Sequence, residues 1–129
     1  MNYWAIVHHD PGSAYGVSFP DVPDCFAAAD EEKDIMRNAI AAIDDYFDDG
    51  HAYPEPRAVS DIVKGYAEDL AAGAFLIHVP VVRRSAKTVR ANISMEQGLL
   101  EAIDEAADRL QMNRSAFLAQ AARHEIERV

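Results

Sequence analysis

The chain has 129 residues, half of them hydrophobic, and a formal net charge of −10 at pH 7. This composition allows a sizeable folded core and excludes a wholly disordered chain. A single cysteine, Cys25, excludes an internal disulfide framework, and we find neither a signal peptide nor an apolar run long enough to span a membrane. We therefore expect a cytoplasmic protein of one or two small domains.

The charge is divided unevenly along the chain. Residues 1–80 hold fifteen Asp and Glu against four Lys and Arg, whereas residues 81–129 hold seven against eight. Every charged side chain from Arg83 to Met95 is basic. This asymmetry predicts two modules, at residues 1–82 and 83–129, with partners of opposite charge, although many acidic domains are simply soluble.

A β-hairpin is predicted at the start of the chain. Residues 3–9 and 14–19 are rich in β-forming side chains, and the Asp-Pro-Gly-Ser sequence at residues 10–13 favours a turn. The two-proline stretch from Pro20 to Cys25 predicts a loop, followed by a short third strand at residues 25–28.

The first helix is predicted to begin at Asp30, a good N-cap residue, and to end near Gly50. Its apolar residues recur at helical spacing, at Ile35, Met36, Ala39, Ile40, Ile43 and Phe47. Four acidic residues lie near its C-terminal end, at Asp44, Asp45, Asp48 and Asp49. They could contact a basic partner, but a solvated helix face is the simpler interpretation.

A second helix and a fourth strand complete the predicted N-terminal module. Ser60 is expected to cap a helix that runs to about Leu70 and is ended by Gly73. Residues 74–82 are nearly all apolar and predict a buried strand, which Pro80 places near a sheet edge or at a bend. The module is predicted to be an antiparallel sheet of three strands joined by this fourth one, with helices on one face.

Residues 87–95, with the sequence KTVRANISM, alternate between polar and apolar side chains. Successive side chains of a strand point to opposite faces, so this pattern predicts a strand with one apolar and one polar face. No further strand follows, and a lone strand would leave its backbone groups unpaired. We therefore predict antiparallel pairing with the same strand of a second copy, which gives a two-stranded ribbon that fits the DNA major groove.

Two helices are predicted after this strand, at residues 96–110 and 115–129, with a turn at residues 111–115. Their apolar stripes are Leu99, Ile103, Ala106, Ala107 and Leu110 in the first, and Phe117, Leu118, Ala121, Ala122 and Ile126 in the second. A module of about 45 residues with two helices cannot bury a stable core alone. We therefore expect it to fold only as a homodimer.

Both parts of the chain resemble known families. Residues 87–129, with KTVRANISM followed by MNRSAFLAQAA, resemble a ribbon-helix-helix repressor domain. Residues 1–82 are similar to the HicB antitoxin domain, which also has an N-terminal hairpin and an acidic helix start. Five residues match the loop of that family, namely Phe19, Pro20, Asp21, Pro23 and Cys25. Asp24 stands where the family usually has glycine.

The resemblance implies an α+β chain, with an N-terminal partial ribonuclease-H-like domain (β-β-β-α-β) and a C-terminal ribbon-helix-helix domain. It implies a type II antitoxin that covers a HicA-type toxin, which cleaves messenger RNA using a histidine. The C-terminal domain would bind the operator of its own operon and repress it. A homodimer through the ribbon strand is implied, and a tetramer is left open. An acidic module that masks a basic RNA-binding protein agrees with the charge division.

The polar face of the ribbon supplies the candidate base contacts. Arg90 can pair with guanine and Asn92 with adenine through two hydrogen bonds each, and Thr88 and Ser94 would flank them. The alternative is an ordinary solvent-facing strand.

Two further groups are candidates for contact with phosphates. Lys87, with Arg83 and Arg84, would add attraction that weakens with salt. Asn113, Arg114 and Ser115 precede the last helix, where free backbone N–H groups suit an anion. A plain helix cap at this position is compatible with that role.

Enzyme functions are not favoured. His8 and His9 are adjacent and would point to opposite faces of a strand, and the other histidines lack metal-ligand spacing. The acidic residues near the predicted strands lie in turns, unlike the gathered carboxylates of a ribonuclease H enzyme. Cys25 lacks an activating base and is interpreted as a buried apolar residue. We predict no catalysis, no metal and no cofactor.

Two other functions are considered. The chain could be a stand-alone ribbon-helix-helix regulator whose N-terminal module senses a small molecule or oligomerises. It could also be a nuclease with a DNA-targeting tail.

Overall fold

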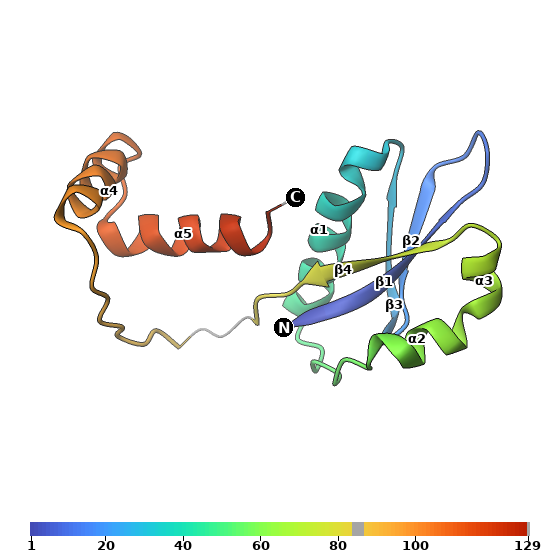
Figure 1. Ribbon diagram of the computed structural model, residues 1–129. Helices are drawn as coiled ribbons and strands as arrows, with labels where there is room; N and C mark the ends of the chain where they lie inside the picture. The colour runs from blue at the N-terminus through green and yellow to red at the C-terminus, as the bar shows by residue number, and fades with distance from the viewer. Residues whose placement is uncertain (84–86, 129) are drawn as a thin grey trace. The chain divides into compact units, whose positions relative to one another are not determined.

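The computed structural model describes residues 1–83 and 87–128. The chain divides into two compact units, Met1–Arg84 and Ser85–Arg128. Figure 1 labels the helices and strands of both units. The structure is of the α+β kind, because the first unit combines a sheet with helices and the second is helical where it is regular.

The N-terminal unit is built on a four-stranded antiparallel sheet with the order β3-β2-β1-β4. The strands are β1 (Asn2–His9), β2 (Tyr15–Phe19), β3 (Val22–Ala29) and β4 (Phe75–Pro80). The predicted hairpin is confirmed. Its turn is closed by the Ser13 N–H, which donates to the Asp10 carbonyl at 3.0 Å, and Gly12 takes the positive φ that the turn requires.

The helices of the chain are short to medium in length. They are η1 (Glu32–Asp34), α1 (Ile35–Asp48), α2 (Val59–Gly65), α3 (Ala67–Ala71), α4 (Gln97–Arg109) and α5 (Arg114–Ile126). In the described part of the chain, none has the length and apolar character needed to cross a membrane.

Three predicted boundaries in the N-terminal unit are wrong. Asp30 does not cap α1, because the 3-10 turn η1 comes first. Ser60 lies inside α2, and the single helix predicted to run to Leu70 is broken at Tyr66, whose φ of −121° is not helical. The predicted loop at residues 20–25 is mostly part of β3. Pro23, which lies in β3, is tolerated because the ladder between β2 and β3 is irregular there, so a missing N–H costs little.

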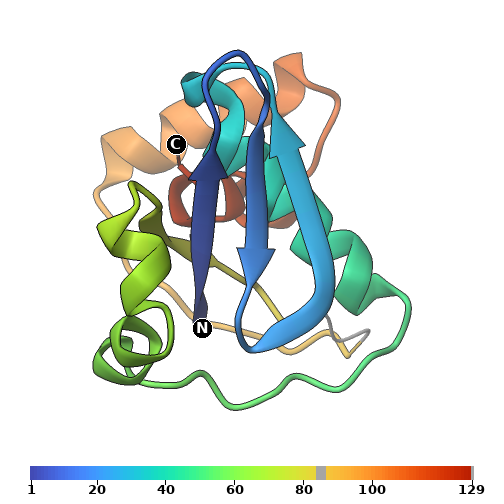
Figure 2. The same cartoon turned by 90° about the vertical axis from the view of Figure 1, so that its right-hand side faces the viewer.

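The main core lies between the sheet and α1. Figure 2 shows α1 behind the strands, and its predicted apolar stripe is buried except for the half-buried Met36. Gly50 follows the helix with φ of +91° and donates its N–H to Phe47, as expected of a helix stop. The sheet contributes its inward-facing side chains, among them Tyr3, Val7, Phe19, Cys25 and Val79.

Helices lie on both faces of the sheet, which corrects the prediction of helices on one face. Ile6 points away from α1 and is fully buried, as is Ile62 of α2. His8, which lies on the same face as Ile6, contacts Asp69 of α3 at 3.3 Å. The pair α2 and α3 therefore covers part of the face opposite α1 (Figure 2).

The strand β4 is an edge strand, as Pro80 predicted, but it is not buried along its length. Phe75 is 38% exposed and His78 is exposed, whereas Val79 is fully buried. An apolar run can therefore occupy a sheet edge when only alternate side chains reach the core.

The C-terminal unit contains two helices that bury very little. Both predicted helices are present, and Ile103 and Ala107 of α4 are the buried side chains among the described residues of the unit. Leu99, Leu110 and Ile126, which were expected to face inward, are each more than half exposed. One copy of this unit lacks the neighbours that would cover its apolar stripes.

The strand predicted at residues 87–95 is not formed in the single chain. Residues 87–96 have no helix or strand, and Val89 and Ile93 are 72% and 66% exposed. A strand needs a neighbour to satisfy its backbone groups. In the described part of the chain, no strand pairs with this segment.

Candidate nucleic-acid and partner interfaces

The segment of residues 87–95 carries the predicted base-contacting side chains on an exposed, irregular backbone. Thr88, Arg90, Asn92 and Ser94 are all exposed. None of them is held beneath α4 or α5, so they are accessible to a ligand. Of the apolar residues that alternate with them, Val89, Ala91 and Ile93 are also exposed and Met95 is half-buried. The polar face of this segment and most of its apolar face are therefore uncovered.

A groove of about 810 Å³ lies between this segment and the two helices. It brings together four of the predicted DNA-contacting residues, Asn92 and Ser94 from the segment and Arg114 and Ser115 from the start of α5. Its other lining residues are Val89, Ala91, Ile93, Met95, Leu100, Leu118 and Ala119. Seven of the eleven lining residues are thus apolar, and Lys87, Thr88 and Arg90 are not among the lining residues.

The start of α5 is organised by local hydrogen bonds. The Asn113 side-chain oxygen accepts from the Ala116 N–H at 2.8 Å, which confirms the cap predicted there. The first N–H groups of any helix lack partners within the helix, so the positive end of the α5 dipole lies at Arg114 and Ser115, which are both exposed.

Arg114 is already paired within its own unit. Its Nε donates to Oδ1 of Asp104 and its Nη2 donates to Oδ2, each at 2.9 Å. This two-point hydrogen bond lowers the pKa of Asp104 from its ordinary value. The pairing joins α4 to α5 and holds the guanidinium in a fixed position. Sequence reasoning missed it because the two residues are ten positions apart on different helices.

The N-terminal unit presents an acidic surface. Asp45 and Asp49, from the acidic run at the end of α1, are exposed, as are Asp24 on β3 and Asp61 on α2. Asp21 is different, because its carboxylate forms an ion pair with Arg57 and accepts the Arg57 backbone N–H at 3.0 Å. Asp21 therefore anchors the loop before α2, a structural role that the sequence did not indicate.

Cys25 is buried, as predicted. Its side chain is 4% exposed, and burial raises the pKa of its thiol to about 11. A thiol with this pKa stays protonated at neutral pH, and it is neither a strong nucleophile nor a ready metal ligand.

The histidines of the hairpin contact separate neighbours. His8 contacts Asp69, whereas the His9 ring stacks on Tyr15 with centroids 3.8 Å apart and its Nε2 lies 3.0 Å from the Ser13 carbonyl oxygen. In residues 1–83 and 87–128, no three His, Cys, Asp or Glu side chains are grouped so that they could hold a metal ion.

Comparison with solved structures finds similar antitoxins. The crystal structure of the Burkholderia pseudomallei antitoxin HicB matches with 29% identity and a TM-score of 0.55, covering 97% of this chain and 96% of that one. The crystal structure of antitoxin HicB3 matches with 30% identity and a TM-score of 0.55, covering 98% of each chain. The N-terminal domain of the B. pseudomallei antitoxin, solved separately, matches with 27% identity and a TM-score of 0.51, covering 64% of this chain and all of that one.

Comparison with curated proteins finds no match. The model of a family described as the HicB-like antitoxin of bacterial toxin-antitoxin systems matches residues 3–122, nearly the whole length of the chain. The chain therefore belongs to the HicB-like antitoxin family.

Proposed function

We propose that the N-terminal unit neutralises a HicA-type, mRNA-cleaving toxin by binding it. The family match over residues 3–122 is the observation that carries this proposal. The charge of the unit supports it, because an RNA-binding toxin needs a basic surface and residues 1–80 hold fifteen acidic side chains against four basic ones. The unit would act by covering the toxin and would need no catalytic group of its own.

The C-terminal unit is proposed to be a ribbon-helix-helix domain that dimerises, binds the operator of its own operon and represses it. Residues 87–95 alternate between polar and apolar side chains and have no partner strand in the described chain. Several large apolar side chains of this segment and of both helices are exposed, namely Val89, Ile93, Leu99, Leu110 and Ile126. A second copy would pair the backbones and cover these side chains, and it would leave Thr88, Arg90, Asn92 and Ser94 on the outer face.

In this dimer the two kinds of DNA contact have separate residues. Arg90 and Asn92 would read base edges in the major groove. Asn113, Arg114 and Ser115 would face the phosphates at the start of α5, and Lys87 would add non-specific attraction. Asp104 holds the guanidinium in place through Nε and Nη2, so a phosphate would contact Arg114 through its remaining N–H groups. The N-terminal unit would then be the partial ribonuclease-H-like fold of the family.

Co-expression tests the antitoxin function. The chain is produced together with a short, basic protein encoded beside its gene, and growth and co-purification are measured. We expect that the partner alone arrests growth and that the chain restores growth and purifies with the partner. A chain that neither restores growth nor retains any such neighbour would contradict the proposal and would favour a stand-alone regulator.

DNA binding is tested separately with the chain alone. Gel-shift titration on the DNA upstream of its own gene should give a specific complex whose affinity falls steeply as salt is raised. Analytical ultracentrifugation should show a dimer at the same concentrations. A monomer that binds no DNA more tightly than a random duplex would exclude the repressor function and leave the antitoxin function standing.

A further inference from the structure

The direction of backbone hydrogen bonds can be followed across the sheet of the N-terminal unit. The Val81 N–H donates to the Met1 carbonyl at 2.8 Å, so the backbone N–H and C=O groups of odd-numbered residues of β1 point toward β4. The backbone groups of even-numbered residues, such as Ile6, therefore point toward β2. Ile6 pairs with Ser18, so the backbone of Ser18 faces β1. Phe26 is the partner of Ser18 in β3, and its N–H and C=O therefore point away from the sheet.

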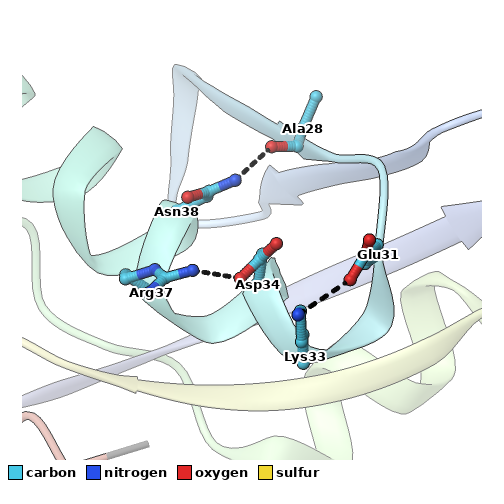
Figure 3. A network of polar contacts seen from close by, with 6 residues as sticks. All are labelled: Ala28, Glu31, Lys33, Asp34, Arg37 and Asn38. Atoms are coloured by element: carbon cyan, nitrogen blue, oxygen red, sulfur yellow. Dashed lines mark hydrogen bonds and ion pairs between the residues drawn. The ribbon is translucent and has the colours of Figure 1, made fainter.

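A second hydrogen bond supports this direction independently. The Asn38 amide on α1 donates to the Ala28 carbonyl at 2.9 Å (Figure 3). Ala28 lies two residues after Phe26 in the same strand, so the backbones of both residues face the same side. On the outer edge of β3, the Ala28 carbonyl thus already accepts a hydrogen bond from the Asn38 side chain. The outward N–H and C=O of Phe26 could pair with a partner strand.

The two edges of the sheet differ in their protection. Pro80 of β4 is the partner of Asn2, and its backbone points away from β1, toward the outside of the sheet. Proline has no N–H to offer an added strand at this position. Such a proline discourages the addition of another strand. The proline of β3, Pro23, lies where the ladder to β2 is irregular, before the regularly paired residues 26–29, which include no proline. The part of this edge around Phe26 therefore lacks that protection.

The Phe26 side chain also marks the β3 edge. It is 67% exposed, more than any other large apolar side chain described in the N-terminal unit. It lies on the face that points away from α1, beside the small side chains of Ser18 and Ala28. Figure 2 shows no helix over β2 and β3 on this face. An exposed aromatic ring next to outward-facing backbone groups is the arrangement that strand-adding partners use.

We propose that the β3 edge around Phe26 is the docking site of the toxin, where an extended segment of that basic protein adds a fifth strand and packs on the Phe26 ring. This inference rests on the proposed antitoxin function and names the surface that performs it. The backbone of Phe26 would supply hydrogen bonds, and the ring would supply an apolar anchor.

Charge favours a basic partner at this edge over a second copy of the chain. Pairing of β3 with its own copy would bring together two units that are each rich in acidic residues, with the exposed Asp24 of each copy near the contact. Like charges placed across an interface oppose association, whereas a basic RNA-binding protein is attracted.

Three variants of the full-length chain test the site. The probe is the toxin encoded beside the gene, with its catalytic histidine replaced so that it can be purified, and its dissociation constant is measured by calorimetry. Phe26→Ala should weaken binding about tenfold by removing the ring. Phe26→Pro also removes the outward N–H without touching the ladder to β2, so it should weaken binding about tenfold more. Phe75→Ala, the same deletion on the opposite edge strand, should stay within about twofold of the wild type.

The outcomes separate this inference from the proposed function. If the wild type binds and Phe26→Ala binds equally well, the docking site is wrong while the antitoxin function stands. If Phe26→Pro is no weaker than Phe26→Ala, no strand is added at this edge. If the Phe26 variants change the oligomeric state and leave toxin affinity unchanged, the edge joins copies of the chain. If the wild type does not bind, the proposed function and the docking site both fail.

Discussion

The two units of this chain differ in how completely each one buries its apolar side chains. In the N-terminal unit, a sheet and α1 enclose a core that includes Tyr3, Phe19, Ile43 and Phe47, each at most 4% exposed. In the C-terminal unit, two short helices bury little, and the preceding segment leaves Ile93 in water. The first unit therefore has its own buried core in one copy, and we propose that the second completes its core with another chain.

The largest expected effect is on the core of the N-terminal unit. Ile43 is fully buried, so Ile43→Ala leaves a cavity and should lower the free energy of unfolding of this unit by about 2–5 kcal/mol. Chemical denaturation followed by tryptophan fluorescence measures the loss, because Trp4, the single tryptophan, lies in this unit. The exposed Val63→Ala on α2 is the control and should cost much less. Equal losses would mean that α1 does not form the core.

The next prediction concerns Ile93, which is exposed in a single copy of the chain, in contrast to the buried Ile43. Ile93→Ala should leave the unfolding of the N-terminal unit unchanged but weaken the dimer, since about 1.5–3 kcal/mol of apolar burial per chain is lost. Sedimentation over a dilution series measures the dissociation constant. Val63→Ala, which truncates an exposed apolar side chain of the N-terminal unit, is the control and should leave the dissociation constant unchanged. An unchanged dissociation constant for Ile93→Ala would show that residues 87–95 do not join the copies.

A smaller effect is expected when one polar side chain is removed from the ribbon. Arg90→Ala should lower operator affinity by about 1–3 kcal/mol and relax the base preference at one position, because a contact to guanine is lost. Toxin neutralisation should be unaffected. Gel-shift titrations on operator variants and growth rescue measure the two properties. An equal loss of both would show that the two units do not act separately.

The smallest effect at neutral pH concerns Cys25. Its folded pKa of about 11 lies above the ordinary value of 9.0, so the buried thiol contributes fully to stability below pH 9. That contribution is lost as pH rises through the folded pKa, because the unfolded chain releases the proton first. Stability measured from pH 7 to 11 should fall in the upper part of this range, and Cys25→Ala should flatten that fall. Rapid alkylation of native Cys25 at pH 8 would contradict this burial.

Local patterns in the sequence were reliable where short-range geometry decides the structure. The turn at Asp10–Ser13 depends on a few adjacent residues, and so does the Asn113 cap. The apolar stripe of α1 follows from helical spacing alone. The same kind of pattern failed at the start of α1, because η1 precedes the helix and moves its first residue from the predicted position.

The sequence by itself determined the hairpin, the positions of α4 and α5 and the membership of the antitoxin family, since these depend on residues that are close in the chain or on motifs in a given order. Tertiary structure alone decided which apolar stretches are covered. It made β4 an exposed edge, joined Asp21 to Arg57 and Asp104 to Arg114, and left residues 87–96 without a strand. The physical reason is that burial and backbone pairing depend on neighbours distant in sequence, and we propose that a second chain supplies those neighbours for the C-terminal unit.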